Sequence, residues 1–296
     1  MQPWKIKLDA DKNVFYLFID SKRLTKEVDP YARQTMITQG TFLEYVRVAG
    51  EKLGYKTDIT LFPDGEYDEQ NLEENMKNKP VAKIVLTKVE PKDSSLYNYL
   101  FLPDTNRGAY KAQKLTPENI KKLLATNTDS DLTFNIFQDE ENNKRLGNYA
   151  IKGARIESGI HRINQESANI FRTNEYQKNK YRYGFSVEGQ GTTGVMKHVM
   201  QGLITLFPSM NNEKVSADLY VKSTQTAVDN TPAYAMIISK GNSRSEQVKS
   251  SMLYSKLVLT AHSLGLVMQP LSQVLEEYPE MKEQYTKIHK DYVPNG

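Results

Sequence analysis

The sequence predicts an α+β fold in which long helices pack on a mainly antiparallel sheet. Strand-like and helix-like segments follow one another, but without the regular alternation that is typical of a parallel sheet. Two long amphipathic segments, 29–53 and 242–264, each begin at polar capping residues and end at a glycine. The composition, with 39% hydrophobic and 25% charged residues, is that of a globular chain.

Strands are indicated by alternating or continuous apolar residues bounded by turn residues. Trp4 to Leu8 and Val14 to Ile19 surround a polar turn, which predicts a hairpin. Further strands are expected at 57–62, 81–89, 132–137 and 233–239. The last of these is strongly apolar, so we expect it to be covered on at least one face.

The helices are predicted from capping residues and from apolar residues three or four positions apart. Asp29-Pro30 resembles an N-cap followed by proline at the first helical position, so a helix is expected from Asp29 to Leu53. The second long helix is expected from Asn242 to Leu264. Shorter helical segments are expected at 96–102, from 117 onward, at 140–176 with breaks near Gly153 and Gly159, and at 271–289.

Residues 177–231 are rich in Gly, Asn, Thr and Lys around a helix at 195–206. Such a segment is typical of a lid or insertion over a site. The run Gly189 to Gly194 lies inside it. The run is only weak evidence for a phosphate-binding loop, because no Lys-Ser/Thr pair follows it and no clear strand precedes it.

The two long helices match each other when the sequence is shifted by 211 positions. Arg33 then falls on Arg244, and Gly40 falls on Ser251, so both helices carry a small residue at mid-length. A small residue lets two helix axes approach closely, so we expect the two long helices to be buried and packed together at the centre, with Gly40 and Ser251 near the contact. Chance agreement between two amphipathic helices is the alternative to a true duplication.

The composition excludes several classes of function. With 39 basic against 36 acidic residues, the net charge of +3 is too even for a nucleic-acid surface. The chain has no cysteine, so disulfides and thiolate sites are excluded. None of the four histidines has a partner at metal-ligand spacing, and no apolar run reaches the roughly 20 residues of a membrane span. His262, on an apolar helix, is expected to be a core residue.

Three short segments carry side chains that could hold a ligand. Thr105-Asn106-Arg107 joins hydrogen-bonding groups to a guanidinium, which can bind a phosphate bidentately. Gln2-Pro3-Trp4 could line a flat heterocycle, and the segment 269–272 offers backbone groups at the edge of a cleft. The simpler alternatives are a loop arginine that faces water and a strand that begins with a packing tryptophan.

The order of these segments resembles the nitroreductase superfamily, in its single-chain Acg-like branch. Gln2-Pro3-Trp4 is similar to the end of the family's Pro-Ser-x-x-Asn-x-Gln-Pro-Trp segment, and residues 29–33 are similar to the Asp-Pro-x-x-Arg helix of the branch. Thr105-Asn106-Arg107 resembles the end of an Arg-x-Thr-Asn-Arg box. The end of the second long helix and the turn after it, 264–273, resemble the family's late helix and flavin-facing turn.

The resemblance implies an FMN-binding, internally duplicated fold, with a first nitroreductase-like half at 1–100 and a second at 101–296. One flavin would lie between the halves of a monomeric pseudo-dimer or a homodimer. It implies that Arg107 holds the FMN phosphate beside Thr105 and Asn106. Gln2, Pro3 and Trp4 would lie near the isoalloxazine ring, and Pro270, Leu271 and Ser272 would lie on its other side.

The chain departs from the family pattern at three places. Pro103 stands where the first arginine of the Arg-x-Thr-Asn-Arg box is expected, which removes one positive charge from the phosphate site. The Pro-Ser-x-x-Asn part is missing before Gln2, and an Arg-bearing strand is missing after Asn295, so both ends look shortened. A cytoplasmic location is expected, unless an export signal precedes this sequence.

The resemblance implies an oxidoreductase in which NADH or NADPH reduces the flavin and a nitro compound or quinone reoxidises it. Hydride transfer requires no protein acid or base, so no catalytic residue is assigned. A flavin-binding or flavin-storage protein with little turnover is the alternative, with 177–231 covering the flavin. The partners are then small molecules, not nucleic acid or membrane, and no metal is expected.

Overall fold

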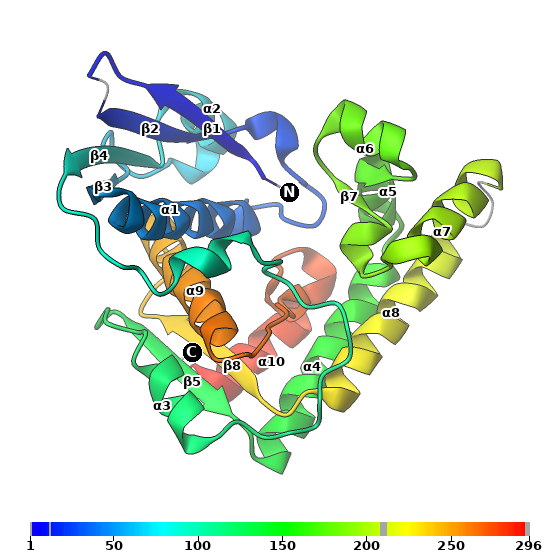
Figure 1. Cartoon of the computed structure of the whole chain (residues 1–296). Helices are drawn as coiled ribbons and strands as arrows, with labels where there is room; N and C mark the ends of the chain where they lie inside the picture. Colours follow the sequence, from blue (N-terminus) through cyan, green and yellow to red (C-terminus); the bar gives the residue numbers. More distant parts are fainter. Residues whose placement is uncertain (1, 12, 208–211, 294–296) are drawn as a thin grey trace.

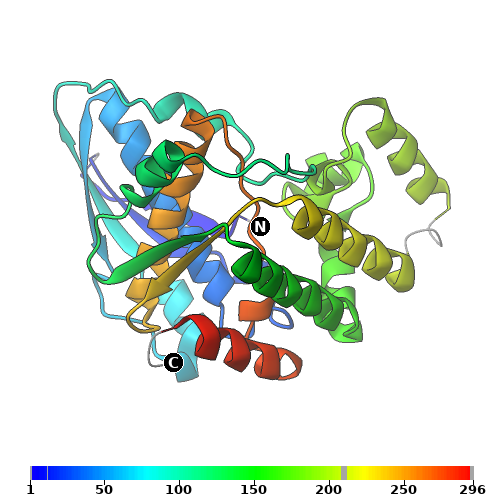
Figure 2. The same cartoon turned by 90° about the horizontal axis from the view of Figure 1, so that it is seen from below.

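The computed structural model describes residues 2–11, 13–207 and 212–293. Figures 1 and 2 show a body built of two sheets with helices between them, and a helical projection to one side. We call this projection, residues 161–230, the arm. The expected class of mixed helices and antiparallel sheets is confirmed.

The larger sheet has the order β1-β2-β4-β3, with every neighbouring pair antiparallel. The expected hairpin is β1 (Trp4–Leu8) and β2 (Val14–Ile19), with Trp4 opposite Ile19. The other two strands are β4 (Ala82–Lys88) and β3 (Tyr55–Leu61). Alternate apolar side chains of this sheet are buried in one core cluster with residues of the first long helix; among them are Leu17 and Ile19 of β2 and Ile84 of β4.

A second, separate sheet pairs β5 (Leu132–Phe137) with β8 (Tyr234–Ser239) in antiparallel register. Beside it lies α3 (Pro117–Leu124), where Thr116 accepts a hydrogen bond from the backbone N–H of Asn119 at 3.2 Å, the expected cap. The arm holds the parallel pair β6 (Phe171–Arg172) and β7 (Phe185–Ser186). The strands therefore belong to separate sheets, because helices lie between the two larger ones.

The two long helices, α1 (Arg33–Leu53) and α9 (Arg244–Ser263), pack against each other at the centre of the body. A Cβ atom on Gly40 would lie 2.0 Å from Ser251 Oγ and 2.1 Å from the carbonyl oxygen of Val248. The helix axes therefore approach at Gly40, and the expected contact between Gly40 and Ser251 is confirmed. The duplication of the two halves stays a prediction.

The start of α1 differs from the expectation. The helix begins at Arg33 instead of Asp29, because Ala32 adopts a left-handed backbone with φ of +53°. The Asp29 carboxylate accepts hydrogen bonds from the backbone N–H groups of Gln34 at 3.1 Å and Thr35 at 3.0 Å. Asp29 thus satisfies the free amides of the first turn from outside the helix. At the other helix, Ser243 and Glu246 form a capping box.

Two further helix boundaries are corrected. α4 (Glu140–Ser158) continues through Gly153, where the missing side chain lets the backbone of Val274 approach. The expected helix at 271–289 is wrong, because the chain first makes two short turns. These are η6 (Gln273–Leu275) and η7 (Pro279–Met281), and only then does α10 (Lys282–Tyr292) begin.

The segment 177–231 is mostly helical. The expected helix at 195–206 is confirmed, whereas the role of the segment as a lid stays a prediction. The arm consists of α5 (His161–Ile170), α6 (Glu175–Tyr181), α7 (Gly194–Leu206) and α8 (Glu213–Asn230), with η4 (Glu188–Gln190) in its one long loop. α8 was not expected at all. It packs along α4, with Thr224 and Ala227 buried in the contact.

The remaining elements are short. They are η1 (Ser21–Arg23), η2 (Glu69–Asn71), α2 (Leu72–Asn78) and η3 (Tyr97–Phe101). Within the residues that the structure describes, no helix combines the length and the apolar character that a membrane span requires.

Candidate functional site

The opening segment is fixed on α1 by its tryptophan. The indole N–H of Trp4 donates to the carbonyl oxygen of Thr38 at 2.9 Å, and its ring packs against Phe42 with centroids 5.0 Å apart. The carbonyl oxygen of Gln2 accepts from Arg23 Nη1 at 2.6 Å. Trp4 therefore packs in the core and holds the strand, while Gln2 is exposed.

Pro3 is buried and lines a recess of about 220 Å³ between the body and the arm. The recess is lined from the body by Arg23 and by polar side chains before and within the first turns of α1, and from the arm by Ile170, Gly184 and Phe185. Thr25, Asp29, Gln34, Thr35 and Thr38 are the polar lining residues. Burial raises the pKa of the Asp29 carboxyl, although its backbone hydrogen bonds from α1 oppose this effect.

The Thr105-Asn106-Arg107 turn is held by Asn106. Its backbone N–H donates to the carbonyl oxygen of Met268 at 2.7 Å. Its side chain accepts from the Gly108 N–H at 3.1 Å and donates to the Gly108 carbonyl at 2.7 Å. The turn that follows α9 therefore lies directly beside the turn predicted to bind phosphate, although 162 positions separate Asn106 from Met268 in the sequence.

Arg107 is exposed, and it makes no hydrogen bond or ion pair within the described parts of the chain. Its positive charge lowers the pKa values of two nearby tyrosines, Tyr110 and Tyr254, whose burial raises them. A guanidinium that lies beside two half-buried phenols and lacks an internal carboxylate is available to an anion.

The third predicted segment lies near the turn but offers fewer groups. Pro270 is exposed, whereas Leu271 and Ser272 are half-buried. The carbonyl oxygen of Ser272 accepts from the N–H of Leu275 at 2.8 Å and so begins η6. Gln273 follows, and its buried Oε1 lacks a hydrogen-bond partner among the described residues. An unpaired buried acceptor is costly, so a donor from outside the chain would stabilise it.

The arm loop 184–191 touches two of the three predicted segments. Gly184 and Phe185 share the recess with Pro3. A Cβ atom on Gly191 would lie 2.8 Å from Arg107 Cβ, so the loop backbone rests against that arginine. Gly191 has a φ of +98°, a conformation that favours glycine. A side chain at position 191 would therefore both strain this turn and collide with Arg107.

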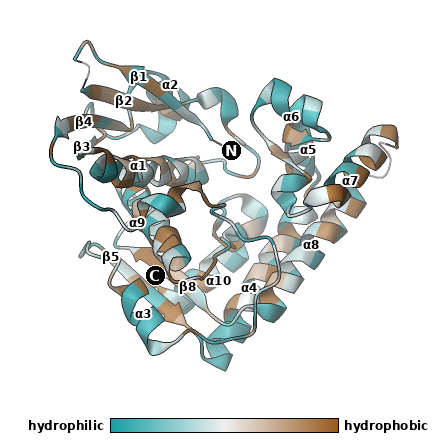
Figure 3. Cartoon of the chain, in the orientation of Figure 1, coloured by the Kyte–Doolittle hydropathy of each residue, from teal (hydrophilic) through white to brown (hydrophobic). Residues whose placement is uncertain are grey.

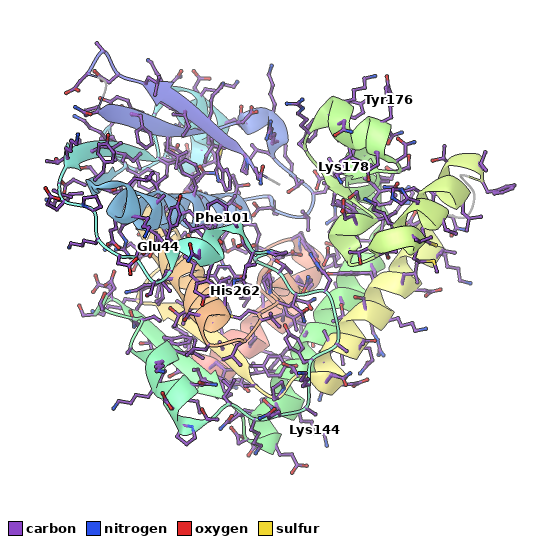
Figure 4. The ribbon with its side chains drawn as sticks, viewed as in Figure 1. Glu44, Phe101, Lys144, Tyr176, Lys178 and His262 are labelled. Atoms are coloured by element: carbon purple, nitrogen blue, oxygen red, sulfur yellow. The ribbon has the colours of Figure 1, made fainter. Side chains whose placement is uncertain are left out.

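His262 and Glu44 lie on the central helix pair, as Figure 4 shows, and Phe101 lies beside it. His262 is buried, as expected of a core residue, but its Nδ1 has no partner among the described residues. Glu44 is buried and bonds to Arg47 at 2.7 Å. Within the part of the chain that the structure describes, no three His, Cys, Asp or Glu side chains gather as a metal site.

The groups around Arg107 suit the phosphate of FMN, whereas the recess beside Pro3 would hold only part of its ring. Arg107 supplies an unpaired cation, and Thr105 and the 106–108 backbone lie next to it. The recess beside Pro3 is smaller than the roughly 300–1,000 Å³ of ordinary ligand pockets. Among the nine predicted residues, Pro3 is the one that lines it. The loop 184–191 lies against both places, at Arg107 through Gly191 and at the recess through Gly184 and Phe185.

Sequence reasoning missed several residues of this region. Arg23 bonds to Gln2 and lies over the ring of Tyr183 in the arm, with its Cζ 5.5 Å from the ring centroid. Phe185 reaches the recess from the arm. These residues carry no local motif, because only the tertiary placement of the arm brings them to Pro3. The sequence feature that could have indicated the recess is the pair of small polar residues Thr35 and Thr38, which line it from α1.

A scan of the chain against protein-family models gave no match, and a search of curated proteins found no significant match.

Proposed function

We propose that the protein binds FMN with its phosphate at Arg107 and its ring toward Pro3. The observation that carries this proposal is the hydrogen bond from the Asn106 N–H to the Met268 carbonyl, which joins two predicted flavin segments at 2.7 Å. The same turn leaves the Arg107 side chain without a partner in the described chain. A phosphate there would receive charge-assisted hydrogen bonds, which are stronger than neutral ones.

We propose further that the bound flavin serves an NAD(P)H-dependent oxidoreductase that reduces nitro compounds or quinones. The flavin would supply the hydride chemistry, and the chain would supply binding and orientation. Hydroxyl and amide groups of Thr35, Thr38 and Gln34 would face the ring edge from α1, where hydrogen bonds influence the flavin's electronic properties. No side chain is assigned as an acid or base.

A flavin-storage protein with little turnover is the second candidate, and one observation favours it. The loop 184–191 rests on Arg107 through Gly191 and shares the Pro3 recess through Phe185. A loop in that place would cover bound flavin and would hinder the approach of a nicotinamide. The two candidates share the same site and differ only in access to it.

FMN titration of the purified chain tests the site. Arg107→Ala should weaken FMN binding by about 1.5–3 kcal/mol, or roughly ten- to a hundredfold. Arg155→Ala is the matched control, because Arg155 is likewise exposed and its side chain has no partner among the described residues. Equal affinities for the two variants would refute the phosphate site. Release of FAD instead of FMN would refute the cofactor.

Anaerobic mixing of the FMN-loaded protein with NADH or NADPH separates the two candidates. Rapid bleaching of the flavin absorbance followed by reoxidation with a quinone supports the oxidoreductase. A flavin that stays oxidised with both nucleotides supports storage. The same flavin reduction is measured with Gly191→Ala, because a Cβ there must displace the loop from Arg107. If the loop hinders the nicotinamide, this variant should be reduced faster than the wild type.

A further inference from the structure

Helix α7 leaves an apolar stripe exposed to solvent. Two polar side chains point into the arm, beside the half-buried Met200 and Ile204: Lys197 is 15% exposed and Gln201 is 5% exposed. Other apolar side chains point outward, with Val195 80% exposed and Leu206 74% exposed. A surface helix normally turns its apolar face to the core.

The hydrogen bonds of the inner face show what holds α7 in place. Lys197 Nζ lies 3.4 Å from carboxylate oxygens of both Glu175 and Glu188, and Gln201 Nε2 donates to Glu175 at 3.0 Å. Thr205, one turn further, lies 3.3 Å from the Asn174 side chain. These residues are spaced by four, so they form one stripe along the helix.

The apolar residues form the opposite stripe. At about 100° per residue, Val195, Val199 and Leu206 lie within roughly 40° of one another, and Lys197 and Gln201 lie on the far side. Figure 3 shows hydrophobic residues, coloured brown, along α7 at the outer end of the arm. With its neighbours on α7 and at the end of that helix, this stripe forms what we call the outer α7 face: Val195, Met196, Val199, Leu206 and Phe207.

The outer α7 face is as large as the largest apolar patch that a monomer usually exposes. Its five side chains are each about half to four-fifths exposed. Together they expose an area on the order of 600 Å², the upper end of what a monomer leaves in water. A standard interface buries about 800 Å² on each partner, so this face with its rim is large enough for one.

We propose that the outer α7 face is the contact between two copies of this chain in a twofold homodimer. A twofold contact places the same surface on both sides, so the surface must be complementary to itself. The exposed stripe of α7 has His198 at its edge but carries no Asp, Glu, Lys or Arg, so two such stripes meet without repulsion between like charges of those residues. A face with a single sign of charge would not allow this.

The charges around the face argue against a lipid surface as its occupant. Helices that lie on anionic membranes have Lys and Arg along their polar border. Here the one lysine of α7 is paired with two glutamates inside the arm. The charged residues of α8 alternate in sign, with Glu213 beside Lys214 and Asp218 before Lys222. Neither helix therefore offers a row of unpaired cations to anionic lipid.

The first test is the mass of the full chain in solution between about 1 and 200 μM, by sedimentation equilibrium or light scattering. We expect twice the monomer mass of 33.9 kDa at the upper concentrations. Val199→Glu places two carboxylates in one contact and should raise the dissociation constant at least a hundredfold. Leu8→Glu is the control, because Leu8 is 77% exposed on β1, far from the arm, and should leave the dimer unchanged.

Two further measurements make the contact itself visible. The chain has no cysteine, so Met196→Cys or Val199→Cys introduces a single thiol. Mild oxidation should link one of these variants into a disulfide dimer, whereas Leu8→Cys should form no disulfide-linked dimer. Mixing Val199→Glu with Val199→Lys should restore the dimer mass that each variant lacks alone. Circular dichroism of each variant shows that the fold is retained.

Several results would overturn the proposal. The wild-type chain could remain at the monomer mass at every concentration, or it could form a dimer that Val199→Glu and the cysteine variants leave unaffected. A monomer that binds lipid vesicles through Val195 and Val199 would assign the outer α7 face to a membrane and would equally refute the homodimer.

Discussion

Gly40→Ala tests the central packing of the molecule most directly. Its new Cβ would lie 2.0 Å from Ser251 Oγ and 2.1 Å from the Val248 carbonyl oxygen, where an ordinary contact needs at least about 3.4 Å. The serine hydroxyl can rotate away, but the carbonyl belongs to the α9 backbone. The helices α1 and α9 must therefore separate by about 1 Å or more, or tilt.

The expected magnitude follows from two opposing effects. Alanine favours the helical state by about 1 kcal/mol relative to glycine. Overpacking costs about 1–3 kcal/mol or more, and a gap of 0.5–1 Å forfeits a quarter to a half of each dispersion contact along the pair. Buried neighbours such as Leu43 and Leu257 would lose such contacts. We expect a net loss of about 2–4 kcal/mol in the free energy of unfolding.

Urea unfolding followed by circular dichroism measures this loss as a shift in midpoint at constant slope. Gly202→Ala is the matched control, because Gly202 is also helical but a Cβ there meets nothing within 4 Å; since Gly202 lies in the stripe of the proposed α7 contact, both variants are measured at concentrations where the chain is monomeric. It should be neutral or should stabilise by up to about 1 kcal/mol. Adding Ser251→Ala to Gly40→Ala should restore little, since the Val248 carbonyl remains. Equal effects of the two glycine substitutions would refute this account of the helix contact.

Three substitutions test other contacts. Asp29→Ala should cost about 1–2 kcal/mol, measured by urea unfolding, because two amides of α1 lose their acceptor; Asp64→Ala, a carboxylate in an exposed turn, should cost nothing measurable. Glu69→Ala should cost about 1–3 kcal/mol by the same assay, because the buried guanidinium of Arg244 loses bonds to both oxygens of Glu69, a side chain that is itself 58% exposed; Lys26→Ala, which breaks an exposed pair, is its control. Burial, with a smaller contribution from Glu157, raises the pKa of Glu276 to about 9. The stability that depends on its protonated carboxyl is therefore fully present below about pH 4.5 and is lost as the pH rises toward 9. Glu276→Gln should therefore flatten the decline in stability between pH 5 and pH 8, by up to about 4 kcal/mol, and parallel pH profiles of the variant and the wild type would show that this carboxyl is solvated.

Local patterns predicted the body well, because its elements are determined by neighbours in the sequence. The hairpin of β1 and β2 follows from alternating residues, and the capping box at Ser243 fixes the start of α9. Even the contact between Gly40 and Ser251 could be anticipated, since a small residue at the middle of each long helix marks a close approach. The start of α1 could not, because the left-handed Ala32 is set by the Asp29 bonds to α1.

The candidate site was less predictable, because its parts meet only in the folded chain. The sequence identified the turn at Arg107 and the turn after α9, but no local pattern says that Asn106 bonds to Met268. The arm contributes Phe185 and Gly191 through a loop whose path depends on α4 and α8. The composition of 177–231 suggested a lid, and that reading missed α8 altogether.

Helix α7 shows why composition alone misleads in this segment. Its apolar residues recur at helical spacing, and such a stripe usually indicates a face that packs on the core of the same chain. Lys197 and Gln201 reverse that inference, because they satisfy Glu175 and Glu188 inside the arm and fix which face points outward. The direction of a helix face is therefore decided by its buried polar partners. In α7 those partners direct Val195, Val199 and Leu206 toward whatever binds the arm from outside.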